Sequence, residues 1–220
     1  MGPIPMMQIL RFVSSHPLTR DHKLQACFRV LNWQLRSRLK SEIYMPWIAG
    51  TKLVVKRGMT GATGNVYAGL HEFVDMSFLL HFLRPTDLFI DAGANVGSYT
   101  VLASGVCKSR SISFEPASET SMHLRANIKA NALENLVVVH EVALGANVGT
   151  VRFTVGLDTT NRVAKPGNHQ NTRLVAQARL DDILADENPN LIKVDVEGYE
   201  EEVLKGAERI LSNRSLVASN

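Results

Sequence analysis

The chain has 220 residues, enough for one sizeable domain, and its 45% hydrophobic and 20% charged residues are values of globular rather than disordered or fibrous proteins. Its apolar runs are far shorter than the roughly 20 residues of a membrane-spanning helix. Residues 1–20 lack the features of a signal peptide. Two cysteines, Cys27 and Cys107, exclude a disulfide framework and a four-cysteine zinc site. We therefore expect a cytoplasmic protein without a transmembrane segment.

The net charge of +3 is unevenly distributed. Residues 1–57 contain ten Lys or Arg and two acids, a net of +8, whereas residues 58–220 carry a net of −5. We expect residues 1–57 to form a basic, partly helical N-terminal segment and residues 58–220 to form the main domain.

The N-terminal segment contains apolar residues at spacings of three and four, which predict an amphipathic helix over residues 21–39. These residues are Leu24, Phe28, Leu31, Leu35 and Leu39. Such a helix either packs against the body with a solvated basic face, or meets an anionic substrate, a membrane surface or nucleic acid. Because no aromatic residues typical of a base-stacking surface are interleaved there, we expect no nucleic-acid partner.

From about residue 70 helical and strand patterns alternate. Helices are expected over 71–84, 96–106, 118–131 and 199–211, and strands over 88–90, 111–114, 136–139 (continuing toward 143), 191–196 and 216–218. Residues 150–155 and 174–180 are expected to form a hairpin around a polar loop, 156–172. This order predicts the α/β class, with a doubly wound, mainly parallel sheet covered by helices on both faces.

A glycine-rich turn, Asp91-Ala-Gly93-Ala-Asn95-Val-Gly97, follows the first strand of this pattern and opens a helix. Glycines at such a turn let the backbone approach a ligand, and the helix N-terminus offers unpaired N–H groups. Glu115 ends the next strand, where a carboxylate can accept both ribose hydroxyls of a nucleoside. The combination predicts a nucleoside cofactor site.

The spacing of the turn discriminates between cofactors. It does not match the dinucleotide pattern G-x-G-x-x-G, which disfavours a nicotinamide-dependent oxidoreductase. An acid two residues before the first glycine suits a cationic ligand better than a pyrophosphate. S-adenosylmethionine (SAM) carries a sulfonium and an ammonium group and fits on these grounds.

Three segments, DLFIDAGANVGSYT, ISFEP and LIKVDVEGYEEEVLKGAERIL, resemble the FkbM family of SAM-dependent methyltransferases. The resemblance covers about residues 65–217. It implies a Rossmann-like class I methyltransferase fold for residues 58–220, SAM as the cofactor, and methyl transfer to a hydroxyl of a small molecule, sugar or lipid.

The resemblance also implies roles for individual residues. Asp91, Gly93, Asn95 and Gly97 would cradle the amino-acid end of SAM, Glu115 would hold the ribose, and Val142 and Ala143 would lie near the adenine. Asp195, in the third segment, would lie where this fold faces the methyl group and the acceptor, and Glu197 belongs to the same segment and is a second candidate catalytic residue.

Asp195 and Glu197 also stand out without the resemblance. Two acids at the end of a strand built mainly of Leu, Ile and Val are costly to place unless they meet partners. Either Lys193, two residues back, forms a structural ion pair with Asp195, or the carboxylates orient or deprotonate an acceptor hydroxyl. Because no nearby histidine completes a ligand set, we expect no metal site.

The acceptor is expected to lie under the polar loop 156–172, where Asn161 and Arg162 are candidate hydrogen-bonding residues. Glu72, in the helix before the glycine turn, is a further candidate that either closes over the site or is an ordinary exposed acid. His169 is a remote candidate for a base.

Family members normally continue through a complete fifth strand and a final antiparallel pair, so we expect the sheet to be truncated at these strands. The exposed edge beside the fourth strand would be used for homodimerisation, be covered by the basic helix, or weaken the fold. A non-catalytic SAM-binding or interaction protein is the alternative function.

Overall fold

The computed structural model describes residues 6–156, 161–164, 171–213 and 216–219. The positions 157–160 and 165–170 of the expected acceptor loop, including His169, lie outside the described residues.

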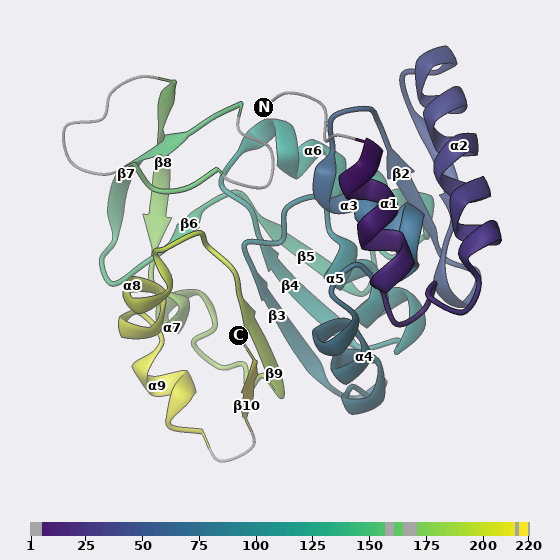
Figure 1. Ribbon diagram of the computed structural model, residues 1–220. Coiled ribbons are helices and arrows are strands. Elements are labelled where there is room, and N and C mark those ends of the chain that lie inside the picture. The colour runs from purple at the N-terminus through teal and green to yellow at the C-terminus, as the bar shows by residue number, and fades with distance from the viewer. Residues whose placement is uncertain (1–5, 157–160, 165–170, 214–215, 220) are drawn as a thin grey trace.

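A five-stranded parallel sheet forms the centre of the molecule, in the order β10-β9-β3-β4-β5 (Figure 1). The strands are β3 (Leu88–Ala92), β4 (Arg110–Phe114), β5 (Val137–His140), β9 (Leu191–Val194) and β10 (Val217–Ser219). They are connected by α5 (Ser98–Thr100) with a π-helical turn (Val101–Val106), α6 (Ser118–Ala130), α7 (Leu180–Ile183), α8 (Glu200–Lys205) and α9 (Glu208–Leu211). The predicted α/β class and doubly wound parallel sheet are confirmed.

Both faces of the sheet are buried, because successive side chains of a strand point to opposite faces. Ile90 and Ile192 pack with Leu180, Val203 and Ile210 of the helices α7, α8 and α9. On the other face, Phe89 and Leu191 pack with Met76 and Leu79 of α4 (Phe73–Phe82). Burial on both faces explains why these strands read as continuous apolar runs.

The strand order reverses at the centre of the sheet. The chain runs outward from β3 through β4 to β5, and then returns to place β9 on the other side of β3. In open α/β sheets, ligands bind beyond the carboxyl ends of the strands at such a switch point. The glycine turn follows β3 and Asp195 follows β9, so both lie at this point.

A second, three-stranded sheet of order β6-β8-β7 lies beside the central sheet. It consists of β6 (Ala143–Leu144), β7 (Gly149–Thr154) and β8 (Thr172–Ala178), and the β7–β8 pair is antiparallel. The expected hairpin is confirmed. The expected continuation of the third strand toward residue 143 is wrong in detail, because β6 pairs with β8 rather than with β4.

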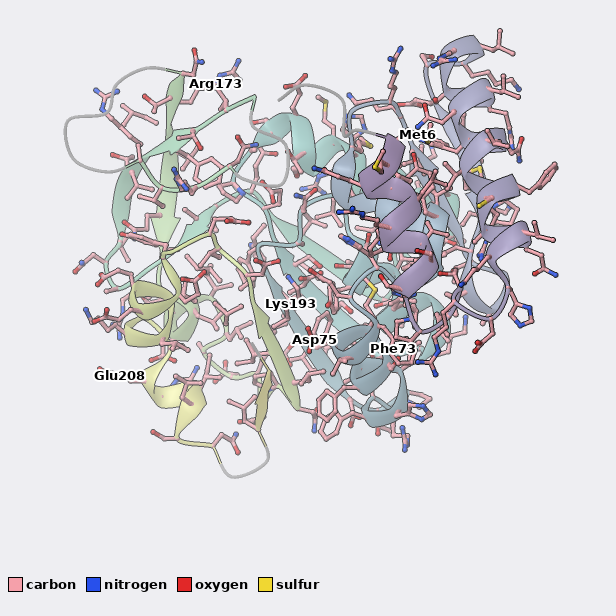
Figure 2. The ribbon with its side chains drawn as sticks, viewed as in Figure 1. Met6, Phe73, Asp75, Arg173, Lys193 and Glu208 are labelled. Atoms are coloured by element: carbon pink, nitrogen blue, oxygen red, sulfur yellow. The ribbon has the colours of Figure 1, made fainter. Side chains whose placement is uncertain are left out.

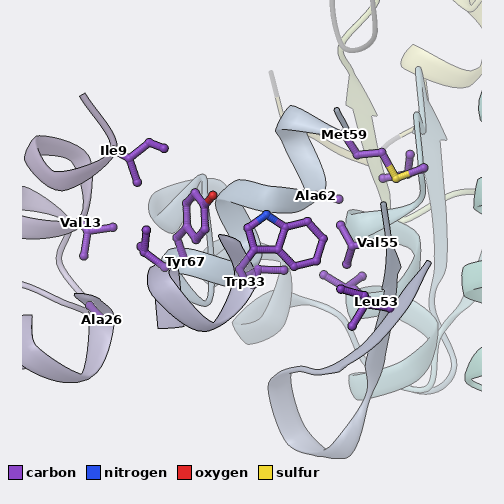
Figure 3. Close-up of a cluster of buried hydrophobic side chains, with 13 residues drawn as sticks. Ile9, Val13, Ala26, Trp33, Leu53, Val55, Met59, Ala62 and Tyr67 are labelled. Atoms are coloured by element: carbon purple, nitrogen blue, oxygen red, sulfur yellow. The ribbon is translucent and has the colours of Figure 1, made fainter. Parts of the chain in front are cut away.

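The N-terminal part packs onto the main domain through its own hydrophobic cluster (Figure 3). It contains α1 (Met6–Ser15), α2 (Lys23–Leu39), the antiparallel strands β1 (Ile43–Pro46) and β2 (Lys52–Val55) joined by a 3₁₀ turn (Ile48–Gly50), and α3 (Thr60–Ala68). Trp33 of α2 lies in this cluster with Leu53 and Val55 of β2 and Tyr67 of α3. The domain boundary near residue 57 stays a prediction.

The predicted helix over residues 21–39 is confirmed as α2, and of the alternatives left open, packing of its leucine stripe against the body is not observed. The five apolar residues that define its stripe, Leu24, Phe28, Leu31, Leu35 and Leu39, are all exposed. Instead, Ala26, Val30, Trp33 and Ser37 are buried. The large indole of Trp33 packs against β2 and α3, and this contact places the leucine stripe on the outer side of the helix.

The predicted single helix over residues 199–211 is divided into α8 and α9. The carbonyl of Gly206 accepts a hydrogen bond from the Asp181 amide at 3.0 Å. The Asp181 carboxylate in turn accepts from the amides of Arg209 and Ile210, at 2.9 and 3.1 Å, and so caps the start of α9. A residue from α7, remote in sequence, therefore sets the break.

The sheet edge beside β9 is paired, since β10 forms a parallel ladder with residues 191–193. Among the described strands β10 is thus outermost on that side, and pairing of two copies there stays a prediction. The basic helix α2 does not cover this edge, because its described buried residues pack against β2 and α3. Within the described ranges, no helix combines the length and apolarity needed to cross a bilayer.

Candidate active site

A cavity of about 1190 Å³ opens at the carboxyl ends of the central strands. Typical small-molecule sites measure roughly 300–1,000 Å³, so this cavity is somewhat larger than a usual single-ligand site. Its wall includes both sides of the switch point, from Gly93 after β3 to Asp195 after β9. A side pocket of about 180 Å³ shares Glu72, Tyr99, Lys193 and Asp195 with it.

Gly93 brings the turn after β3 against the backbone after β9. Its φ is +80°, and a Cβ atom there would lie 2.0 Å from the carbonyl oxygen of Asp195. Only glycine combines this dihedral with this approach. The residue therefore fixes the distance between the two halves of the site and lines the cavity without filling it.

Asn95 and Glu115 join the first two strand ends. The Asn95 amide donates to Glu115 Oε2 at 3.0 Å, and the Ala117 amide donates to Glu115 Oε1 at 2.9 Å. Asn95 adopts a left-handed φ of +50°, which asparagine tolerates better than most residues. Both Asn95 and Glu115 line the cavity.

Glu115 is only 6% exposed. Burial raises its pKa to about 7, against the opposing effect of the two backbone hydrogen bonds. Each carboxylate oxygen has a second lone pair, so the side chain still accepts hydrogen bonds from a ligand in the cavity.

Asp91 is completely buried at the end of β3. Its Oδ2 accepts a hydrogen bond from the Thr100 hydroxyl at 2.7 Å. Its Oδ1 accepts none from the described residues and lies 3.9 Å from Lys193 Nζ. Burial raises the pKa of Asp91, whereas Lys193 and Thr100 oppose the shift.

The predicted cofactor residues thus differ in their access to the cavity. Gly93, Asn95, Glu115, Val142 and Ala143 line it together. Asp91 and Gly97 are not among the described lining residues. Gly97 has a φ of +87° and packs against Leu124, so its observed environment is that of a helix contact.

Lys193 connects the acids of β3 and β9. Its ammonium lies 3.0 Å from Asp195 Oδ2 and 4.8 Å from the ring centroid of Tyr99. It lies on β9 beside β3 (Figure 2). In the ladder of these two strands Lys193 is paired with Asp91. The suggested Lys193–Asp195 ion pair is present, yet the Asp195 side chain is 51% exposed and lines the cavity. The pair therefore orients a carboxylate that a ligand can reach.

Glu197 lies two residues beyond Asp195, and its exposed side chain also borders the cavity. Its backbone has a left-handed φ of +53°. Such a conformation costs a non-glycine residue of order 1–3 kcal/mol, and strain of this kind is concentrated at functional sites.

The candidate acceptor residues are separated by the structure. Glu72 lines the cavity and accepts a hydrogen bond from the Tyr99 hydroxyl at 2.7 Å. Asn161 also lines the cavity. Arg162 is exposed and is not among the described lining residues, and its backbone bonds Thr154. Glu72 and Asn161 thus remain candidates, while the observed contacts of Arg162 are those of a hairpin residue.

Much of the cavity wall was not predicted from the sequence. The N-terminal part contributes Ile9, Phe12, Trp33, Arg38 and Arg57. No local motif marks these residues, because they reach the cavity through the packing of α1, α2 and the segment after β2. Tyr99 could have been predicted as a lining residue, because it follows Gly97 of the glycine turn by two positions and lies on the first turn of α5.

The arrangement suits a ligand with a hydroxylated ring and a cationic group. Glu115 presents a carboxylate on one strand end, and Asp195 presents another across Gly93. Among the described residues, no group of three or more His, Cys, Asp or Glu side chains is placed to hold a metal ion.

Comparison with known proteins gives a consistent family match. A family model described as the methyltransferase FkbM domain matches residues 91–217, which include the glycine turn, Glu115, Asp195 and Glu197.

Two curated relatives match part of the chain. A hexuronic acid methyltransferase, AglP, from Haloferax volcanii is 28% identical over 142 residues, which cover 63% of this chain and 57% of AglP. Methyltransferase 1 from Beauveria bassiana is 30% identical over 148 residues, which cover 56% of this chain and 59% of the relative. The chain thus spans less than two thirds of the length of either relative.

Among solved structures, a methyltransferase FkbM from Methylobacillus flagellatus KT is 27% identical, with a TM-score of 0.47. The match covers 63% of this chain and 34% of that one.

Proposed function

The chain belongs to the FkbM methyltransferase family, and on this premise we propose that it transfers a methyl group from SAM to a hydroxyl of a small acidic acceptor, such as a sugar acid. The observation that carries the proposal is that Gly93, Glu115 and Asp195 border one cavity at the switch point of the sheet. The matched segment contains all three residues.

The residues around the cavity fit SAM. Glu115 offers free lone pairs to the ribose hydroxyls, and Val142 and Ala143 provide an apolar wall for the adenine. Gly93 lines the cavity and lets the turn after β3 approach the Asp195 carbonyl closely, so the two strand ends border one site. Asp91 holds one buried carboxylate oxygen without a described hydrogen-bond donor, which supports an electrostatic role toward a cationic ligand. When bound, SAM would supply a methyl group activated by the sulfonium charge.

This chain's own residues would align the acceptor and accept its proton. Asp195 is held by Lys193 at 3.0 Å and remains half exposed to the cavity. A hydroxyl that donates a hydrogen bond to Asp195 loses its proton to this carboxylate as its oxygen becomes the nucleophile. General-base assistance of this type contributes about 10²–10⁴-fold, and alignment contributes more. Glu197 is the second candidate for this role.

Two observations favour an acidic acceptor. Arg38 and Arg57 border the cavity, and an arginine recognises a carboxylate through paired hydrogen bonds. The relative AglP is named for a hexuronic acid, a sugar that carries a carboxylate and hydroxyls. A small molecule or lipid with the same two groups would satisfy the same side chains.

Ligand binding and turnover test the proposal separately. The melting temperature of the chain is measured with SAM, S-adenosylhomocysteine and NAD. We expect SAM and S-adenosylhomocysteine to raise it and NAD to leave it unchanged. A rise with NAD alone would point to an oxidoreductase, and no rise with any of them would reject the cofactor site.

Turnover is then followed as S-adenosylhomocysteine release with glucuronic acid and galacturonic acid, and with glucose and galactose as neutral controls. We expect release with the acids at a rate well above that with the neutral sugars. Equal rates would reject the acidic acceptor, and SAM binding without turnover on any acceptor would favour a non-catalytic SAM-binding protein.

A further inference from the structure

The outer face of α2 carries an uncovered apolar stripe. Its five side chains, Leu24, Phe28, Leu31, Leu35 and Leu39, are between 56% and 88% exposed. With a rise of 1.5 Å per residue the stripe is about 22 Å long. Figure 2 shows side chains along this side of α2 that project away from the rest of the molecule. Scattered exposed leucines are common, but a continuous stripe of this length marks an interaction surface.

The helix cannot turn the stripe inward. Ala26, Val30 and Trp33 on the opposite face are buried in the cluster formed with β2 and α3. At 3.6 residues per turn the centres of the two faces lie on opposite sides of the helix. Burial of the stripe by rotation would therefore expose Trp33, which is 3% exposed as the helix stands.

Basic side chains border the stripe on both sides. Residues 20–40 contain six Lys or Arg and a single acid, Asp21. By helical periodicity the exposed Lys23 and Arg38 lie along one side of the stripe, Arg38 also bordering the cavity. Arg36 lies along the other side, half-buried, with its guanidinium 3.6 Å from Met45 Sδ. Asp21 is placed against Arg20, at 3.6 Å. The stripe is thus an apolar surface within a field of positive charge.

This charge distribution decides whether the stripe binds a second copy of α2 or a surface of anionic lipids. A second copy of α2 packed on the stripe would bring the two sets of cations together, with few acids to pair them, and like charges disfavour that contact. A surface of anionic lipids satisfies both features, because its headgroups attract Lys and Arg while its acyl region accepts the leucines and Phe28.

We propose that α2 docks the protein on an anionic lipid surface, lying in the interface with its leucine stripe toward the acyl chains. The helix is far too polar to span a bilayer and has the length and two-sided character of an interfacial helix. Docking of this kind does not depend on the proposed methyl transfer, and its test needs no substrate.

The test is co-sedimentation of the full chain with vesicles of phosphatidylcholine alone, or of phosphatidylcholine mixed with the anionic lipid phosphatidylglycerol. We expect at least tenfold tighter binding to the anionic vesicles, weakened by raised salt because the charges are exposed. Binding to neither kind of vesicle, or equally to both, would overturn the proposal.

A matched pair of variants separates the stripe from exposed apolar residues in general. Phe28→Gln/Leu35→Gln removes two stripe residues that are 70% and 63% exposed, and Val148→Gln/Leu174→Gln removes two residues of the β7–β8 region that are 71% and 64% exposed. We expect the first pair to weaken binding at least tenfold and the second to leave it unchanged. Vesicle binding retained by the first pair would overturn the proposal.

Sedimentation velocity without lipid tests whether a second copy of the chain binds the stripe instead. We expect the parent chain and Phe28→Gln/Leu35→Gln to sediment with the same mass. If the parent chain is a dimer, the variant is a monomer and the parent chain does not bind vesicles, the proposal would be overturned in favour of self-association. Because both variants replace exposed side chains, their melting temperatures are expected to match that of the parent chain.

Discussion

The backbone amide of Asn95 donates a 3.0 Å hydrogen bond to the carboxylate of Glu115, and so ties the glycine turn after β3 to the acid after β4. The two residues are 20 positions apart, and their relation follows from the parallel pairing of β3 with β4. The turn and the acid therefore act as one cradle. Replacement of Glu115 is expected to disturb the geometry of the turn as well as the contact with a ribose.

Glu115→Gln is expected to lower the affinity for S-adenosylhomocysteine by about 10- to 100-fold, because hydrogen bonds to a charged group contribute roughly 1.5–3 kcal/mol. Isothermal titration calorimetry measures the change. Glu134→Gln is the control, since Glu134 is an exposed acid outside the described cavity lining. An unchanged affinity of the Glu115 variant would remove the ribose assignment.

The affinity for S-adenosylhomocysteine is also expected to depend on pH. Burial raises the pKa of Glu115 to about 7, and the neighbouring carboxylates of Asp91 and Glu141 act in the same direction. In the proposed role, the ionised form would accept both ribose hydroxyls, whereas the protonated form would lose acceptor capacity. The affinity for S-adenosylhomocysteine is therefore expected to be highest well above pH 7 and to fall as the pH drops through 7. Between pH 8 and pH 6 we expect a decrease of about tenfold.

Titrations at these two pH values check this, with Glu115→Gln expected to show a flat profile. Equal pH dependence in the variant would assign the titration to another group.

The central sheet was predictable because its rules are local or topological. Short apolar runs that alternate with helical patterns predicted β3, β4 and β9, and the glycine turn with Glu115 pointed to residues that line the cavity. The family resemblance pointed to Asp195. None of these inferences needed knowledge of long-range packing.

The features that the sequence did not predict all depend on contacts between distant elements. The sequence left open whether the stripe on α2 faces the body or a partner, and the packing of the Trp33 indole turns it outward. The break between α8 and α9 depends on Asp181, and the cavity wall depends on residues of α1 and α2. Hydrophobic periodicity finds the faces of a helix, but it does not decide which face is buried when one carries a single large aromatic ring.

Gly93→Ala is expected to destabilise the fold by more than about 2 kcal/mol, because the new Cβ would lie 2.0 Å from the Asp195 carbonyl in addition to the strained φ. Urea unfolding measures the difference. Gly50→Ala is the matched control, with a φ of +83° and no atom within 4 Å, so it carries only the conformational cost of about 1–2 kcal/mol. Equal losses in both variants would show that the approach to Asp195 relaxes easily.

Asp181→Ala is expected to cost about 1–2 kcal/mol of folding free energy, since it removes the acceptor of the Arg209 and Ile210 amides. Asp182→Ala, beside it, removes a half-exposed acid that lies 3.8 Å from Arg179 and is expected to change stability by less than about 0.5 kcal/mol. Urea unfolding of the two variants compares them directly. Similar losses would contradict the capping role.

Asp195→Asn separates the proposed chemistry from cofactor binding. The introduced amide would keep the size and most of the position of the carboxylate but would not accept a proton from the acceptor hydroxyl. Turnover on an acceptor is therefore expected to fall by about 10²–10⁴-fold, while the affinity for S-adenosylhomocysteine changes by less than about threefold.

Glu197→Gln is the comparison for Asp195→Asn, because it also replaces an acid that borders the cavity. Release of S-adenosylhomocysteine and calorimetry provide the two readouts. If Glu197→Gln abolishes turnover and Asp195→Asn does not, the base is Glu197, and the ion pair of Asp195 with Lys193 is structural.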